Sequence, residues 1–98
     1  MLPSDALQRH RQKIDDIMRR YERLGITNLR VFGSVARNRD SEESDIDFLI
    51  DAEKVSFFTL GGLQSELEDL LGVHVDLVPS DMIKGEARDE ILTGAIKL

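Results

Sequence analysis

The chain has 98 residues, no cysteine and a formal net charge of −6, from 13 Lys and Arg against 19 Asp and Glu. This length predicts a single domain over residues 1–98 with one core. The absence of cysteine excludes disulfides and thiolate metal sites. The acidic balance argues against direct nucleic-acid binding, which needs clustered cations. No signal peptide or membrane-length apolar run is found, so a cytoplasmic protein is expected, with no membrane partner.

The first predicted element is a long amphipathic helix, with Ser4 as its N-cap and Gly25 as its C-terminal stop. Its apolar face is formed by residues at helical spacing, namely Ile14, Ile17, Met18, Tyr21 and Leu24. We therefore interpret Tyr21 as a core residue. His10 is expected on the polar side of the helix, in solvent.

A short strand at 29–32 is predicted next, and Gly33-Ser34 interrupts it. Ser34 is expected to cap a brief helix that reaches Arg37. The polar segment 38–44 carries both charge signs and is predicted to be an exposed loop.

The later elements are predicted to alternate as a strand at 45–50, a helix at 56–71, a strand at 73–78 and a helix at 84–93. The apolar run Phe48-Leu49-Ile50 predicts burial of the second strand on both faces. Gly72 is expected to end the long helix, and Pro79 the third strand. This order predicts an α/β (α+β) fold in which helices pack on a small mixed β-sheet.

Gly33-Ser34 stands at a strand end, where glycine lets a backbone approach a ligand closely and the first amides of a helix face an anion. We interpret this turn as a candidate phosphate site, although such turns are also common without a ligand. Arg37 follows one turn later and carries forked donors that suit a triphosphate. The alternative for Arg37 is a surface ion pair with Asp40 or Glu43.

Three aspartates form a candidate metal site. Asp45 and Asp47 are two residues apart on a predicted strand, so they project from the same face, and their repulsion is relieved by a cation such as Mg²⁺ or Mn²⁺. A solvated acid pair is the alternative. Asp76 lies between apolar strand formers and needs a partner, either a metal or an arginine or backbone amide. His74 shares the face of Asp76, and the sequence compels no role for it.

Together, Gly33-Ser34, ten intervening residues, Asp45-x-Asp47 and the later Asp76 resemble the signature of the DNA polymerase β-like nucleotidyltransferase superfamily. The runs at 32–37 and 44–48 are most similar to the minimal nucleotidyltransferases. These are stand-alone catalytic domains that are often the antitoxin half of HEPN/MNT toxin–antitoxin pairs. Asn38 departs from the family pattern, in which a glycine often follows the arginine.

The resemblance implies roles for the matching residues. The nucleotide-binding residues would be Gly33, Ser34 and Arg37, and the catalytic and metal-binding residues would be Asp45, Asp47 and Asp76, with two Mg²⁺ ions. It implies an enzyme that transfers AMP from Mg-ATP to a hydroxyl, expected to be a tyrosine of a partner HEPN ribonuclease toxin, and so acts as its antitoxin.

Three alternatives remain open at this point. The chain could be a catalytically silent antitoxin that neutralises the toxin by binding, a nucleotidyltransferase that modifies a small molecule, or a nucleotide sensor without transfer. A homo- or hetero-oligomer is compatible with each of them.

Overall fold

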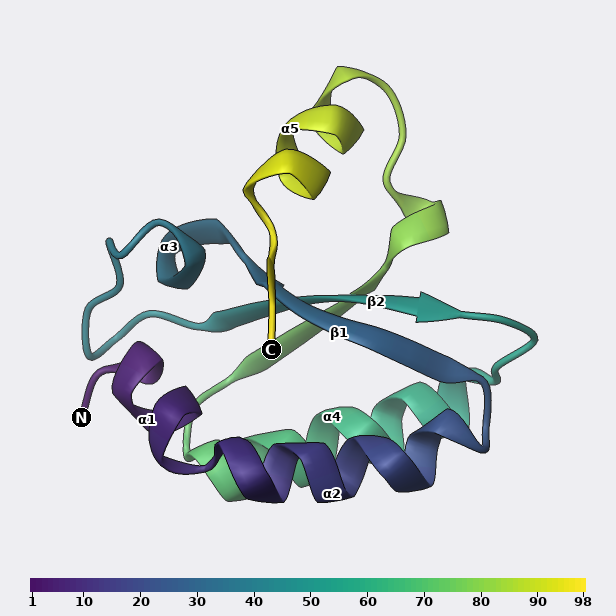
Figure 1. Cartoon of the computed structure of the whole chain (residues 1–98), viewed down its shortest axis with the longest axis horizontal. Coiled ribbons are helices and arrows are strands. Elements are labelled where there is room, and N and C mark those ends of the chain that lie inside the picture. The colour runs from purple at the N-terminus through teal and green to yellow at the C-terminus, as the bar shows by residue number, and fades with distance from the viewer.

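The computed structural model describes residues Met1–Leu98, which form a four-stranded sheet with helices packed on it (Figure 1). The helices are α1 (Pro3–Arg9), α2 (Arg11–Glu22), α3 (Gly33–Ala36), α4 (Phe57–Leu71) and α5 (Glu86–Gly94), with a 3₁₀ turn, η1, at Ser80–Met82. The strands are β1 (Ile26–Phe32), β2 (Ile46–Ala52), β3 (Val75–Pro79) and β4 (Ile96–Lys97). The predicted α+β class is confirmed.

The sheet has the order β3-β2-β1-β4 and is mixed. Strand β1 is antiparallel to β2 and β4, whereas β2 and β3 are parallel. A parallel pair needs a long crossover, which α4 provides. The register pairs Phe32 with Asp47 and Asp47 with Asp76. The aspartates that the sequence singled out therefore lie at one end of the sheet, where β1 ends and where β2 and β3 begin.

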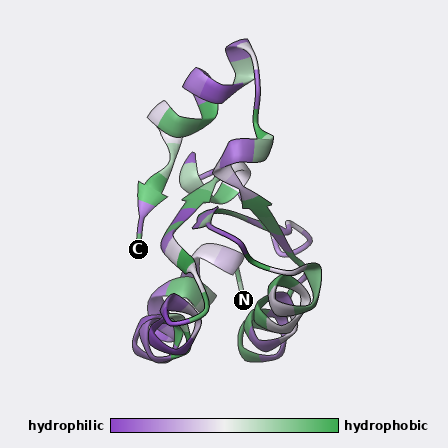
Figure 2. Cartoon of the chain, turned by 90° about the vertical axis from the view of Figure 1, so that its right-hand side faces the viewer, coloured by the Kyte–Doolittle hydropathy of each residue, from purple (hydrophilic) through white to green (hydrophobic).

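Helices α2 and α4 lie side by side on one face of the sheet, and α5 stands on the other side near α3 (Figures 1 and 2). The core lies between the sheet and helices α2 and α4. Its fully buried side chains include Ile14, Leu63 and Leu67 from the helices and Ile26, Ile46, Phe48, Ile50 and Val75 from the strands. No helix reaches the length and apolarity that a membrane crossing requires.

Two predicted elements are confirmed closely. Phe48, Leu49 and Ile50 are all fully buried, so β2 is covered on both faces as its apolar run predicted. Ser56 caps α4 by accepting a hydrogen bond from the backbone N of Thr59 at 3.1 Å. Gly72 ends this helix in the left-handed region, with φ of 72°.

The prediction of a single long N-terminal helix was wrong, because the helix is interrupted at His10 and divides into α1 and α2. Ser4 is not an N-cap. It lies inside the first turn of α1, which starts at Pro3, and its backbone N donates to Asp40 Oδ2 at 3.0 Å. Proline suits the first helical position because it lacks the N–H that would be unpaired there. Leu24 lies beyond the end of α2 and is 55% exposed, so it is no part of the apolar face.

Strand boundaries also differ from the prediction. Strand β1 begins at Ile26, three residues earlier than expected, and a bulge at Asn28, with φ of 56°, interrupts its pairing with β2. The polar Thr27-Asn28 pair concealed this extension. Strand β4 was missed, because two residues carry no periodic pattern.

Candidate active site

The turn after β1 lies very close to the carboxylate of Asp47. Phe32, the last residue of β1, pairs with Asp47 on β2, and Gly33 follows with a φ of 76°. A Cβ at Gly33 would collide with Asp47 Oδ2. Glycine is therefore required here for two reasons, the left-handed backbone and the close approach. The sequence predicted that this turn approaches a ligand closely, and that stays a prediction; in the structure, the close neighbour of Gly33 is the carboxylate of Asp47.

Ser34 and Arg37 flank the same turn. Ser34 was expected to cap the short helix, and this was wrong: α3 begins at Gly33 and has no side-chain cap. Ser34 is half-buried in its first turn. Arg37 directly follows α3 and is exposed, and it forms neither of the ion pairs weighed for it, with Asp40 or Glu43.

The three predicted aspartates meet at this end of the sheet. Asp47 and Asp76 occupy paired positions on the parallel strands β2 and β3, and Asp45 precedes β2. Burial raises the pKa of Asp47, and the charge of Asp76, a hydrogen bond with it and the charge of Asp45 raise it further, while Arg37 lowers it. The carboxyl of Asp47 therefore resists ionisation more than an isolated aspartate does.

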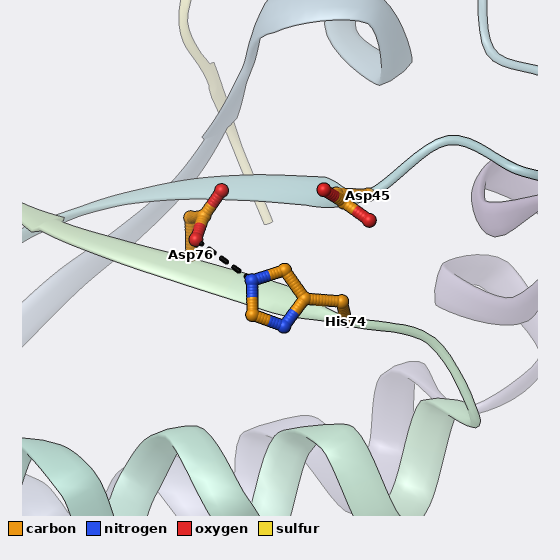
Figure 3. A group of neighbouring side chains, drawn as sticks. All are labelled: Asp45, His74 and Asp76. Carbon is orange, nitrogen blue, oxygen red and sulfur yellow. Dashed lines mark hydrogen bonds and ion pairs between the residues drawn. The ribbon is translucent and has the colours of Figure 1, made fainter.

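Asp45, His74 and Asp76 lie close together, and His74 contacts Asp76, as Figure 3 shows. One potential ligand atom from each of these three exposed residues lies within 4.8 Å of the others. His74 Nε2 is 3.0 Å from Asp76 Oδ1, which confirms the predicted shared face. Burial lowers the pKa of His74, but the hydrogen bond and charge of Asp76, with the charge of Asp45 and the hydrogen bond of Glu68, raise it above its ordinary value.

Glu68 is a neighbour of the site that the sequence analysis missed. Its Oε2 lies 2.8 Å from His74 Nδ1. One signal was present: Glu68 stands in the last turn of α4, where the helix dipole disfavours an anion. A donor such as His74 offsets the cost of a carboxylate in that position.

The donor set fits a divalent cation. Hard cations such as Mg²⁺ prefer carboxylate oxygens, and a cation removes the mutual repulsion that raises the pKa of Asp47. Asp47 lies outside the group of three but contacts it through Asp76. The structure thus brings together the three aspartates named from the sequence.

A pocket lies at the Gly33 turn. It lies between the β1–α3 turn and α5, and its lining residues are Phe32, Gly33, Arg37, Glu90, Ile91 and Gly94. Gly33 belongs to the pocket wall and also abuts Asp47. A molecule in this pocket would contact the Gly33 turn, and Gly33 links the pocket to Asp47, although none of the three aspartates lines it.

A family model described as a nucleotidyltransferase domain matches residues 11–98. The chain belongs to this nucleotidyltransferase family. The family resemblance inferred from the Gly-Ser and aspartate motifs is therefore confirmed, and the chain is an enzyme domain of the transferase class.

This nucleotidyltransferase is 39% identical over 72 residues to the protein adenylyltransferase MntA of Thermococcus cleftensis, covering 72% of this chain and 73% of that protein. A solved structure of a candidate minimal nucleotidyltransferase matches with a TM-score of 0.80 and 35% identity, over 94% of this chain and 95% of the other. A toxin–antitoxin crystal structure with AMP-PNP contains a chain that matches at a TM-score of 0.68 and 20% identity, over 86% and 70% of the two chains. The last match shows a shared fold.

Proposed function

We propose that this nucleotidyltransferase transfers AMP from Mg-ATP to a tyrosine hydroxyl of a partner HEPN ribonuclease toxin and thereby acts as its antitoxin. The observation that carries the proposal is the meeting of Asp45, Asp47 and Asp76 beside the Gly33 turn and its pocket. AMP transfer is supported by the relative MntA, a protein adenylyltransferase. A toxin partner is supported by the shared fold with a chain of a toxin–antitoxin structure, and a HEPN partner by the motif resemblance.

The residues divide between nucleotide and metal. The backbone of Gly33 lines the pocket and would contact phosphate oxygens there, and Ser34 adds a hydroxyl to the turn. Arg37 lines the same pocket and provides positive charge for the triphosphate. The metal ligands are the three carboxylates, Asp45, Asp47 and Asp76.

The reaction is a displacement at the α-phosphorus of ATP. A bond forms between the tyrosine oxygen and the α-phosphorus, the bond from that phosphorus to the β-bridging oxygen breaks, and pyrophosphate leaves with the electron pair. The hydroxyl proton is released to water. Bound Mg²⁺ ions neutralise phosphate charge and make a hydroxyl more acidic. The chain itself contributes the orientation of the carboxylates and the nucleotide.

The decisive experiment incubates the chain with Mg-ATP and a HEPN toxin from a neighbouring gene, followed by intact-protein and peptide mass spectrometry. We expect one or more AMP additions on a toxin tyrosine, together with loss of ribonuclease activity. The Asp47→Asn variant is expected to add none. Asp51→Asn is the matched control, since Asp51 lies on the same strand but outside the site.

Two results would contradict the proposal. Toxin inhibition without added AMP mass would make this chain an antitoxin that acts by binding alone. Consumption of labelled ATP only when a small hydroxyl compound is present would make it a small-molecule nucleotidyltransferase.

A further inference from the structure

Helix α4 holds the start of β3 through two side chains. Glu68 Oε2 accepts a hydrogen bond from the backbone N of Val75 at 3.1 Å, and Gln64 Nε2 donates to the backbone O of Val75 at 2.8 Å. Val75 is fully buried and is the residue directly before Asp76. The backbone that carries Asp76 is thus fixed from the helix side.

The same Glu68 oxygen also reaches the ring of His74, 2.8 Å from Nδ1, and the other ring nitrogen lies 3.0 Å from Asp76 Oδ1. The contacts form a continuous chain from α4 to the candidate metal site. The imidazole is 52% exposed and the Asp76 side chain 50%, so packing alone fixes neither of them. Exposed side chains sample several rotamers unless polar contacts hold them, and these contacts provide that restraint.

The orientation of the Asp76 side chain follows from this series of contacts. One carboxylate oxygen faces His74, and Figure 3 shows the other turned toward the side where Asp45 lies. The backbone O of His74 also accepts a hydrogen bond from Ile46 N at 3.0 Å, next to Asp45. His74 therefore connects both strand ends that bear the acidic side chains.

We propose that Glu68 and His74 are positioning residues, which hold the carboxylate of Asp76 in the orientation that the transfer site requires. The inference rests on the proposed function for its catalytic consequence, while its structural part concerns metal binding alone. Partners that orient metal-binding carboxylates change metal affinity or activity by about 10–100-fold when removed.

Paired substitutions of His74 separate its two contacts. Glutamine places an amide near the position of Nε2 and keeps a donor for Asp76, whereas asparagine places one near Nδ1 and keeps only the contact with Glu68. Neither substitution affects the hydrogen bond from Ile46 N to the backbone O of residue 74. We expect His74→Asn to weaken Mn²⁺ binding about 10–100-fold and His74→Gln to restore most of it.

The binding test uses Mn²⁺ alone, without nucleotide, and follows free Mn²⁺ by electron paramagnetic resonance. Thermal unfolding in the absence of metal checks that the two His74 variants are equally stable. Equal Mn²⁺ affinity in the native chain and in His74→Asn would overturn the proposal. So would nitrogen modulation in the spin-echo spectrum of bound Mn²⁺ that disappears in His74→Gln, because His74 would then be a direct ligand.

A second set of variants tests Glu68. Glu68→Ala removes both contacts, whereas Glu68→Gln keeps a carbonyl oxygen that accepts them. The control is Glu66→Ala on the same helix, since Glu66 contacts Arg20 and Tyr21 instead of the site. We expect the half-saturating Mn²⁺ concentration to rise in Glu68→Ala, to return toward the native value in Glu68→Gln and to be unchanged in Glu66→Ala.

The transfer assay then connects positioning to catalysis. At saturating Mn²⁺, we expect His74→Asn to lower kcat about tenfold or more while KM for ATP is unchanged, since the nucleotide contacts at Gly33 remain. An increase in KM alone would overturn the positioning role. If the native chain transfers no AMP, the proposed function fails, and the Mn²⁺ titrations still decide whether Glu68 and His74 orient Asp76.

Discussion

The two ends of strand β2 carry aspartates in opposite environments. At one end, Asp51 accepts hydrogen bonds of 2.7 Å from Asn28 Nδ2, Arg30 Nη2 and Ser80 Oγ. The hydrogen bonds from Asn28 and Ser80 hold the pKa of Asp51 below its ordinary value, and Arg30 adds to them against the effect of burial. At the other end, burial and neighbouring carboxylates raise the pKa of Asp47.

This difference separates a structural carboxylate from one for which we propose a functional role. Asp51 finds its donors within the fold, so its charge is compensated without a ligand. Asp47 is surrounded by Asp45 and Asp76, and the fold offers it the charge of Arg37 but no ion pair. A bound cation, as proposed above, would compensate the rest of its charge. The same residue type, four positions apart on one strand, therefore finds its partners within the fold at one end and lacks them at the other, where we propose that it binds a cation.

The largest effect is expected for Asp47→Asn, which should lower AMP transfer by about a hundredfold or more, equivalent to about 2.7 kcal/mol of transition-state stabilisation. Asparagine removes one metal-binding charge and also relieves repulsion, so the thermal midpoint without metal should equal or exceed that of the native chain. Kinetic assays and thermal unfolding together check this prediction. Asp51→Asn should show the reverse pattern, with lower stability and retained transfer; similar loss of transfer in both would remove the distinction.

Gly33 supports the functional end by its lack of a side chain. Gly33→Ala should cost about 2 kcal/mol or more, because alanine is strained at φ of 76° and its Cβ displaces the Asp47 carboxylate. Transfer should fall with it. Gly61→Ala is the control, since Gly61 lies inside α4 with no atom within 4 Å of an added Cβ, and it should stabilise the chain by about 0.5–1 kcal/mol. Urea unfolding measures both, and equal effects would show that the Gly33 turn is not constrained.

The functional end was easier to predict from the sequence than the structural end. A glycine-serine turn and aspartates on successive strands form a local pattern with fixed spacing, and the antiparallel and parallel pairings then bring the parts together. The partners of Asp51 come from a bulge, a strand and a 3₁₀ turn that no periodic pattern announces. Sequence spacing therefore predicted the group of aspartates at the site, but it did not predict the hydrogen-bond donors that compensate Asp51.

Local breaks in the chain were also beyond the sequence analysis. The apolar face of Ile14 to Tyr21 predicts a helix, but no periodic pattern marks the interruption at His10, and the contact of Asp40 with the backbone of Ser4 joins residues 36 positions apart. Glu68 was missed for a related reason, because its partners, His74 and the backbone of Val75, follow only after the helix has turned into β3. The contacts of Ser4 and of Glu68 therefore become visible only in the folded chain.

Metal binding should sharpen the contrast between the two ends. Mg²⁺ at ten times its dissociation constant should stabilise the native chain by about 1.4 kcal/mol, which raises the thermal midpoint by about 6–10 °C for a domain of this size. The shift should be retained in Asp51→Asn and lost in Asp47→Asn, and chelation with EDTA should reverse it. A shift of equal size in both variants would place the cation elsewhere.

The smallest effect concerns the structural end and its dependence on pH. The folded-state pKa of Asp51 is lowered below 3.8, so its stabilising contribution is fully present above about pH 4 and is lost as the pH falls through the folded-state value. Its side chain is 39% exposed, so screening limits the contribution to about 1 kcal/mol. Asp51→Asn should therefore be less stable than the native chain at pH 7, and the difference should shrink by pH 3. Urea unfolding at the two pH values measures this, and a difference that does not change with pH would mean that hydrogen-bond shape, rather than the charge of Asp51, stabilises this end of β2.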